Sequence, residues 1–424
     1  MHIIQSPLFD FEAFIAKEGN DRLMMVLEAL PAEGLICALE REHWTGRKGY
    51  SIRGMWSALI AGLLYQRHSL AEVVRLLERD KDTRMVCGFS KDSIPSQDAL
   101  GRFLKKLVEH ADLLEKCFAD LVEEMRQLLP GFGTKLAVDS TDIKAYSNGH
   151  RKSPSDTDAR WGANGVGHHA GPTSGSKVSV DKEGKKEKQR DLYYWFGYKL
   201  HLVVDALYEL PVSFVLTPAN ESDTKQMETL LKKAGADKAD TKPEAVIADK
   251  GYDSRDNYQF IFGNCKSSPI IPIRERENEQ LPDICNAKGT PTCSCGLGMV
   301  FWGRDGNYLK YRCPHALGKA ECKSRFRCTP SSYGYVLKLS IADNPRRHPP
   351  VPRESKKFQR LYRLRTSIER VNSRVKELLG LDRLTVRGIG KVTVRAAISL
   401  LVMLAIGVGM AQRHRLKELR CLIA

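Results

Sequence analysis

Three acidic residues, Asp139, Asp249 and Glu369, lie in local sequences that suit a metal-bound carboxylate. Asp139 and Asp249 each follow a short run of apolar residues, which is typical of a buried strand that ends at a polar site. Carboxylate oxygens are hard ligands that suit Mg²⁺ or Mn²⁺. Two such ions about 4 Å apart can activate a nucleophile and stabilise a leaving oxygen in phosphoryl transfer. The sequence therefore predicts a two-metal site, for which Asp142 and Asp253 are the nearest competing carboxylates.

The segment around Glu369 has the spacing Tyr362-x2-Arg365-x3-Glu369-x6-Lys376. At 100° per residue, these four side chains fall within a helical stripe about 60° wide. The apolar residues of the same segment form a separate stripe centred about 120° away, as expected for a helix with one face in a core. A solvated charged face would give the same pattern. The two aspartates upstream favour a role for this stripe in the acidic site.

With these motifs the chain resembles the DDE transposases of bacterial insertion sequences, in the branch with the Tyr-x2-Arg-x3-Glu-x6-Lys signature. The resemblance extends over roughly residues 50 to 410. It implies a ribonuclease H-like catalytic fold, double-stranded inverted-repeat and target DNA as substrates, two Mg²⁺ or Mn²⁺ ions, and a homodimer assembled on DNA. The resemblance also includes four further sequence segments, which are Val138-Asp-Ser-Thr-Asp-Ile-Lys-Ala, Phe196-Gly-Tyr-Lys-Leu-His, Leu216-Thr-Pro-Ala-Asn-Glu-Ser-Asp and Ala248-Asp-Lys-Gly-Tyr-Asp.

By this resemblance, Asp139 would bridge both metals, and Asp249 and Glu369 would each complete one coordination sphere. The implied reaction is hydrolysis of a phosphodiester to leave a 3′-OH, which then attacks target DNA. Arg365 suits a bidentate phosphate contact and Lys376 a point charge, and Tyr362 could contact a terminal nucleotide. Two alternatives stay open. One is a nuclease or resolvase of the same fold without strand transfer, and the other is an inactive DNA-binding descendant.

Composition agrees with a DNA-binding protein. The 424 residues carry a net charge of +16, and phosphate contacts gain from counterion release. Ribosomal and membrane-surface proteins can be equally basic. The N-terminus lacks the pattern of a secretory signal, and the apolar run 396–411 is shorter than the roughly 20 residues of a spanning helix. We therefore expect a cytoplasmic, nucleoid-associated protein with no membrane partner.

The predicted fold class is α/β, with a mixed sheet and flanking helices. We expect a helical N-terminal domain at 1–130, a catalytic domain at 131–275 plus 341–412, a cysteine-rich β insertion at 276–340, and a basic tail at 413–424. In the catalytic domain the pattern predicts a helix near 223–234 and strands near 134–139, 196–204, 211–217, 244–249 and 269–273.

The N-terminal segment shows apolar residues at helical spacing. Ser96 is a good N-cap for a basic helix that follows it. This arrangement predicts a helix-turn-helix in which Arg102, Lys105 and Lys106 contact phosphates. A helical bundle that only supports the catalytic domain is the alternative.

The polar stretch 148–192 is too long and too poor in apolar residues for an ordered connection. We expect a loop in which His168 and His169 are not metal ligands. Its basic residues could follow a DNA backbone: Lys182, Lys185, Lys186, Lys188 and Arg190.

Five cysteines cluster in the insertion, with His315 near the third. Four thiolates, or three with the histidine, would make a structural Zn²⁺ site, although the first pair is spaced C-x-C and not C-x2-C. Unliganded cysteines around a predicted hairpin at 301–311 are the alternative. The five are Cys293, Cys295, Cys313, Cys322 and Cys328.

Overall fold

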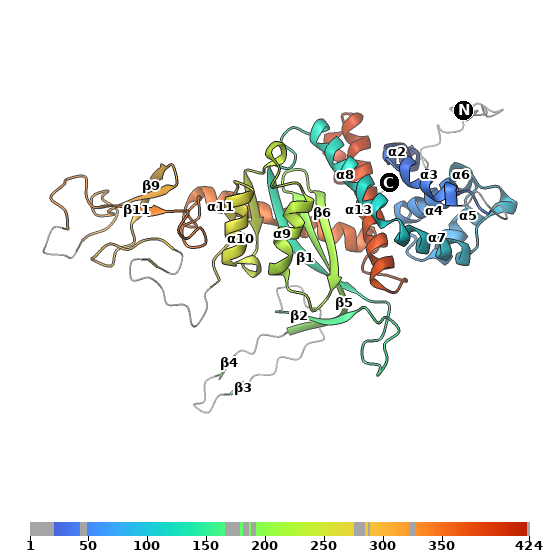
Figure 1. Cartoon of the computed structure of the whole chain (residues 1–424), viewed down its shortest axis with the longest axis horizontal. Helices are drawn as coiled ribbons and strands as arrows, with labels where there is room; N and C mark the ends of the chain where they lie inside the picture. The colour runs from blue at the N-terminus through green and yellow to red at the C-terminus, as the bar shows by residue number, and fades with distance from the viewer. Residues whose placement is uncertain are drawn as a thin grey trace.

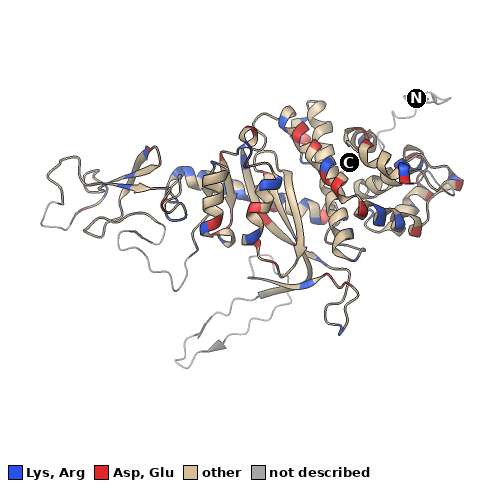
Figure 2. Ribbon diagram, viewed as in Figure 1, with Lys and Arg blue, Asp and Glu red and all other residues tan. Residues whose placement is uncertain are grey.

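The computed structural model describes residues 21–42, 49–165, 179–180, 186–187, 192–274, 285–286, 289–322 and 328–421. Figure 1 shows an elongated molecule, with helices at one end, a central sheet flanked by helices, and a small β unit at the other end. Lys/Arg and Asp/Glu are interspersed along the N-terminal helices (Figure 2).

The N-terminal domain is helical, as predicted. Its helices begin at good capping residues: Ser69 and Glu72 form a capping box at α5, and the Ser96 hydroxyl accepts from Ala99 N at 3.2 Å at the start of α7. The elements are α2 (Asp21–Ala29), α3 (Glu33–Glu42), α4 (Ile52–Leu64), α5 (Leu70–Arg79), α6 (Lys81–Val86), the short η1 (Lys91–Ser93), α7 (Gln97–Glu109) and α8 (Ala111–Leu128).

The central sheet is mixed, with the order β2-β5-β1-β7-β8 and β6 paired to β5. Strand β1 runs antiparallel to β5 and parallel to β7, which itself runs parallel to β8. The strands are β1 (Lys135–Lys144), β2 (Arg160–Gly165), β5 (Leu192–Asp205), β6 (Leu210–Pro218), β7 (Ala245–Ala248) and β8 (Ser268–Ile270); a separate short pair is β3 (Ser179–Val180) with β4 (Lys186–Glu187).

Two strands are longer than the sequence predicted. We expected strands at 134–139 and 196–204, but β1 reaches Lys144 and β5 begins at Leu192. The antiparallel register of β1 with β5 continues as far as Lys144 opposite Gly197, and the added start of β5 pairs with β2. The apolar runs mark only the part of each strand that is buried on both faces.

The prediction that 148–192 lacks order is wrong for its first part. Strand β2 pairs with β5, and the buried carboxylate of Asp156 accepts hydrogen bonds from the Tyr198 hydroxyl at 2.7 Å and from Gly388 N at 3.1 Å. One buried acid thus fixes a polar segment that has few apolar residues of its own. The two histidines at 168 and 169, and Lys182, Lys185, Lys188 and Arg190, lie outside the described residues, and nothing is described of the Lys186 side chain.

Helices cover the sheet and complete the core. They are α9 (Asp223–Lys233), η2 (Ala239–Thr241), η3 (Lys250–Tyr252), α10 (Arg255–Gln259), the π-helical η4 (Phe260–Asn264), α11 (Lys356–Tyr362), η5 (Arg363–Arg365), α12 (Thr366–Ser373), the π-helical η6 (Arg374–Leu378), α13 (Ile389–Gln412) and η7 (Leu416–Glu418). Among the described residues, α13 is the one helix long and apolar enough to cross a membrane, yet 94% of its apolar window is buried. It packs between the N-terminal helices and β6, as expected for a core helix.

The insertion forms its own three-stranded antiparallel sheet in the order β11-β10-β9. Strands β9 (Val300–Asp305) and β10 (Tyr308–Arg312) make the predicted hairpin, and β11 (Val336–Ser340) adds to its edge. The segment that leads from β11 back to the central domain is held by a buried ion pair, in which Arg346 Nη2 lies 2.7 Å from Asp253 Oδ2. Asp253 therefore has a structural partner that explains its burial.

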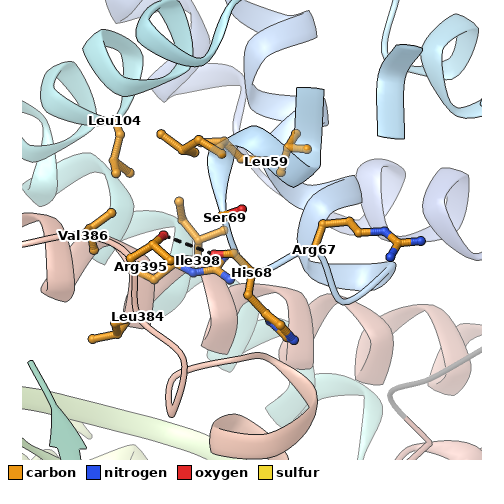
Figure 3. A pocket seen from close by; sticks show the side chains of 12 residues that line it. Leu59, Arg67, His68, Ser69, Leu104, Leu384, Val386, Arg395 and Ile398 are labelled. Carbon is orange, nitrogen blue, oxygen red and sulfur yellow. Dashed lines mark hydrogen bonds between the residues drawn. The ribbon is translucent and has the colours of Figure 1, made fainter. Parts of the chain in front are cut away.

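A cavity of about 30 Å³ lies where the N-terminal helices meet α13. Arg395 of α13 borders it beside His68 and Ser69, with Leu59 and Leu104 on its other side (Figure 3). The Nη2 atom of Arg395 is buried and has no hydrogen-bond partner among the described residues.

Candidate active site

The sheet places Asp139 beside Asp249. In the parallel pairing of β1 with β7, Val138 lies opposite Ala248, and each aspartate is the next residue along its chain. Neighbouring strands are about 4.8 Å apart, so the two carboxylates start from adjacent backbone positions. We expected the two apolar runs to end at one acidic site, and this register does bring Asp139 and Asp249 together. Asp139, however, lies within β1 and not at its end.

Burial and mutual repulsion shape the ionisation of this pair. Burial, followed by the charge of Asp249, raises the pKa of Asp139 to about 7. Burial likewise raises the pKa of Asp249, while a hydrogen bond from Gly251 N at 2.8 Å acts in the opposite direction. The turn needs glycine there, because a Cβ at Gly251 would lie 2.9 Å from Asp249 Oδ1. Two close, part-buried carboxylates make a site that favours a cation.

Arg365 connects Glu369 to the aspartates. Its guanidinium lies 3.6 Å from Asp139 Oδ2 through Nη1 and 2.5 Å from Glu369 Oε1 through Nη2. The Glu369 side chain is 50% exposed, against 22% for Asp139. The third acidic residue therefore faces the same site as the two aspartates, but an arginine stands between them.

Lys376 and Tyr362 reach the same region. Lys376 Nζ donates to Asp142 Oδ1 at 2.8 Å, which gives Asp142 a partner other than a metal. The charges of Asp249 and Asp139 both contribute to the raised pKa of Tyr362, after the larger effect of burial. The helical segment 356–378 thus brings the predicted stripe to β1. We call this segment the signature helix.

The signature helix is irregular, which the predicted uniform helix did not include. Its α-helical turns are joined by the 3₁₀ segment η5 and followed by the π segment η6, so the 3.6-residue period is only approximate along it. Glu209, which is 2% exposed, holds it in place by pairing with Arg370 and Arg374, each at 2.7 Å. These two ion pairs join the signature helix to the residue that precedes β6.

Sequence reasoning missed Asp223, the first residue of α9. Its charge contributes to the raised pKa values of both Asp139 and Asp249. Its Oδ1 lies 3.1 Å from Lys199 Nζ and 3.7 Å from His201 Nδ1. A signal was available, because Asp223 follows an apolar strand, β6, within a few residues, as Asp249 follows β7.

Residues 130–405, more than half of the chain, match the family model described as the transposase DDE domain. The chain belongs to the DDE transposase family. Its helical N-terminal part and mixed sheet form a ribonuclease H-like transposase fold, and family membership implies DNA phosphodiester cleavage and transposition.

Among solved structures, the chain is similar to a piggyBac transposase synaptic complex with hairpin DNA, determined by cryo-EM. The TM-score is 0.39 and the sequence identity 11%, covering 97% of this chain and 78% of that chain. No curated protein matches the chain.

DDE transposases use divalent metal ions, and the acidic residues of this chain suit them. Asp139 and Asp249 offer hard oxygen ligands from adjacent strands, and burial raises the pKa of both although the charge of Arg365 acts in the opposite direction. In the described part of the chain, no three His, Cys, Asp or Glu side chains lie close enough together to hold an ion. Glu369 would have to leave Arg365 to join the two aspartates.

The predicted N-terminal phosphate contacts lie on α7. Arg102 and Lys105 are exposed, whereas Lys106 is half-buried, with Nζ 3.7 Å from Glu42 Oε2. Two of the three basic residues are therefore open to a ligand, and the third has an intramolecular partner.

The structure brings together two of the five insertion cysteines. The sulfurs of Cys295 and Cys322 are 3.4 Å apart, while Cys293 and Cys313 are buried and Cys328 is exposed. Cys293 packs in the apolar core of the insertion with Met299 and Leu309. A four-ligand zinc site is not assembled in the described residues.

Proposed function

We propose that the chain is the transposase of a bacterial insertion sequence, which cleaves DNA at the element's inverted-repeat ends and joins the ends to target DNA. The observation that carries the proposal is the adjacency of Asp139 and Asp249 on two parallel strands, with Glu369 linked to them through Arg365. The match of all four signature positions supports assignment to the insertion-sequence branch.

Asp139, Asp249 and Glu369 would hold two Mg²⁺ or Mn²⁺ ions. When bound, such ions supply Lewis-acid stabilisation and lower the pKa of water. The two aspartates are fixed by the sheet, whereas the half-exposed Glu369 can change rotamer. Its release from Arg365 would bring the third carboxylate to the site and, at the same time, free the guanidinium.

The freed Arg365 would then grip a phosphate oxygen with its planar fork. Lys376 contacts Asp142, which lies on β1 three residues after Asp139. A phosphate that flanks the cleavage site on the bound DNA strand would pass there. Tyr362 is half-buried at the rim and can contact the terminal nucleotide. These three residues would position DNA. Asp223, which contacts Lys199 and His201, adds negative charge to the acidic pair.

We further propose that the protein acts as a homodimer on double-stranded repeat-end and target DNA, within the nucleoid in the cytoplasm. The net charge of +16 suits such a polyanionic partner. The exposed Arg102 and Lys105 of α7 are the proposed N-terminal contacts to phosphates.

The decisive experiment measures cleavage and strand transfer on duplexes that carry the inverted repeats flanking the gene. Asp139→Asn, Asp249→Asn and Glu369→Gln keep side-chain shape but remove the charge that a metal requires. Each should abolish cleavage while repeat-end binding persists. Glu228→Gln, which changes an exposed carboxylate paired with Lys232 on α9, should behave as wild type.

Calorimetric titration with Mn²⁺ gives a second readout that does not depend on catalysis. Wild type and Glu228→Gln should bind the ion, and Asp139→Asn should not. Cleavage by wild type without joined products would identify a nuclease or resolvase. Wild type that binds repeat ends without cutting them would be an inactive descendant.

A further inference from the structure

The sheet of the insertion has two chemically different faces. Side chains on one face, including Leu309 and Tyr311 of β10, are buried in the insertion's own apolar core. Alternate residues point the other way, so Tyr308, Lys310 and Arg312 share the outer face of the same strand. Lys338 lies opposite Lys310 on β11 and belongs to that face.

Large rings are exposed on the outer face and beside it. Trp302 is 51% exposed, Tyr308 50%, Tyr333 46% and Tyr335 38%. The buried core of the insertion is formed by other side chains, such as Met299, Leu309 and Ile341. Exposed aromatic clusters of this kind mark binding surfaces.

Arg312 holds two of the rings in place. Its guanidinium carbon lies 3.5 Å from the centre of the Tyr333 ring and 4.8 Å from that of Trp302. Its Nε also donates to the backbone oxygen of Tyr333 at 2.7 Å. The rings are therefore preorganised, and a ligand that stacks on their free surfaces would lose little side-chain entropy on binding.

The same face is positively charged. Lys310, Lys338 and Arg312 provide three cations, whereas Asp305 is the single carboxylate among the outer-face residues described. Asp305 Oδ2 lies 2.9 Å from Lys310 and 3.3 Å from Lys338, so it orders the two lysines without cancelling the charge of the face.

We propose that this outer face binds single-stranded DNA, with bases stacked on Trp302 and Tyr308 and phosphates beside Lys310, Lys338 and Arg312. Fixed aromatic rings among cations on an open sheet suit unpaired bases, since every base has a face that can stack. Duplex DNA hides those faces between base pairs. An acidic protein could match the charge but would not need rings at this spacing.

This inference goes beyond the proposed function, because the surface lies outside the acidic site and binding here needs no cleavage. In Figure 1 the sheet of β9–β11 lies at one end of the molecule, beyond α10 and α11. A DNA strand that separates from its complement near the acidic site could bind to the outer face of this sheet.

The test measures binding of the full-length protein to fluorescein-labelled oligo(dT)20 and to a 20-base-pair duplex, at one salt concentration. The Trp302→Ala/Tyr308→Ala double variant should bind oligo(dT)20 at least ~10-fold more weakly, because each stacked base contributes substantially to affinity, and should bind the duplex within about threefold of wild type. Tyr50→Ala, which removes an exposed tyrosine outside the insertion, should bind both as wild type does.

Two further variants keep the test independent of folding defects. Trp302→Phe should retain most oligo(dT)20 binding, and Lys310→Gln/Lys338→Gln should weaken it and reduce its salt dependence. Unchanged oligo(dT)20 affinity in the Trp302→Ala/Tyr308→Ala variant, with an unaltered thermal midpoint, would overturn the proposal. An equal loss for duplex and single strand would overturn it as well.

Failure of this inference is distinguishable from failure of the proposed function. Asp139→Asn should bind oligo(dT)20 normally even though it cannot cleave. Unchanged oligo(dT)20 affinity in Trp302→Ala/Tyr308→Ala, together with cleavage of repeat ends by wild type, would overturn this inference and leave the transposase assignment standing.

Discussion

Lys376 Nζ lies 2.8 Å from Asp142 Oδ1, which joins the last turn of the signature helix to β1. The contact places a cation three residues along β1 from Asp139, on the strand that carries the acidic site. A charged helix face exposed only to water would not be anchored to the catalytic sheet in this way. The relationship therefore gives the signature lysine a fixed position beside β1, where it would contact a phosphate that flanks the proposed cleavage site.

We expect Arg365→Ala and Lys376→Ala to bind repeat-end DNA within several-fold of wild type but to cut it at least ~100-fold more slowly. Loss of one charge-stabilising group costs about 2.7 kcal/mol of transition-state stabilisation, whereas overall affinity is shared by many basic residues. Single-turnover cleavage at saturating DNA is the measurement. Arg365→Lys should recover only part of the rate, because lysine lacks the planar fork.

Arg360→Ala is the matched control, since Arg360 is an exposed arginine on α11 of the same helix. It should cut at the wild-type rate. Normal cleavage by both Arg365→Ala and Lys376→Ala at saturating DNA would show that neither of these two residues has a catalytic role.

His201 should make the protein less stable as the pH falls below neutrality. Burial lowers the pKa of His201 to about 4, whereas an unfolded histidine titrates near about 6.5. Between these values the unfolded state binds a proton that the folded state does not, so the free energy of unfolding falls as the pH drops from about 6.5 toward 4. Below pH 4 both states are protonated and no further loss arises from this group.

Urea denaturation of wild type and His201→Gln at pH 7, 6 and 5 measures this effect. Asp139, whose folded pKa is raised, contributes in the opposite sense, since its folded state retains a proton that the unfolded state releases. That contribution is common to both proteins, so the difference between them isolates the histidine. The difference should change by up to about 1.4 kcal/mol per pH unit, and a pH-independent difference would contradict the prediction.

Arg395→Met should leave stability unchanged or raise it by about 1 kcal/mol, because a half-buried guanidinium whose Nη2 lacks a partner in the described structure costs desolvation free energy, and methionine can fill the same space. Burial lowers the pKa of Arg395 to about 10, in agreement with the absence of a partner for Nη2 in the described structure. Urea midpoints of wild type, Arg395→Met and Arg395→Lys are the measurement. A loss larger than about 1 kcal/mol in Arg395→Met would show that the guanidinium has a stabilising partner.

Zinc remains a prediction for the insertion, and the 3.4 Å approach of Cys295 to Cys322 identifies the first two ligands to test. Metal analysis of purified protein should give about one Zn²⁺ per chain. Cys295→Ser/Cys322→Ser should lose the metal and unfold more easily, because binding free energy contributes to folding. Cys87→Ser, which changes a buried cysteine of the N-terminal domain, should keep it; a metal-free wild type that is folded and active would exclude the site.

Much of the architecture followed from local pattern. The helix that follows Ser96, the apolar strands before Asp139 and Asp249, the hairpin of the insertion and the buried helix α13 all depend on periodicity and capping within a few residues. Such signals are present in the chain itself, so they could be read before any tertiary contact was known. Membership of the DDE transposase family could also be predicted from the sequence, because the spacing of the signature is a local property of the chain.

Partnerships between distant segments could not be predicted in this way. The sequence did not indicate that Asp156 would be buried under Tyr198 or that Asp253 would pair with Arg346. Each outcome depends on which strands and helices become neighbours, and residues of the same type elsewhere in the chain remain in solvent. Tertiary packing decided the partners, because the desolvation of a buried charge must be offset by another group at short distance.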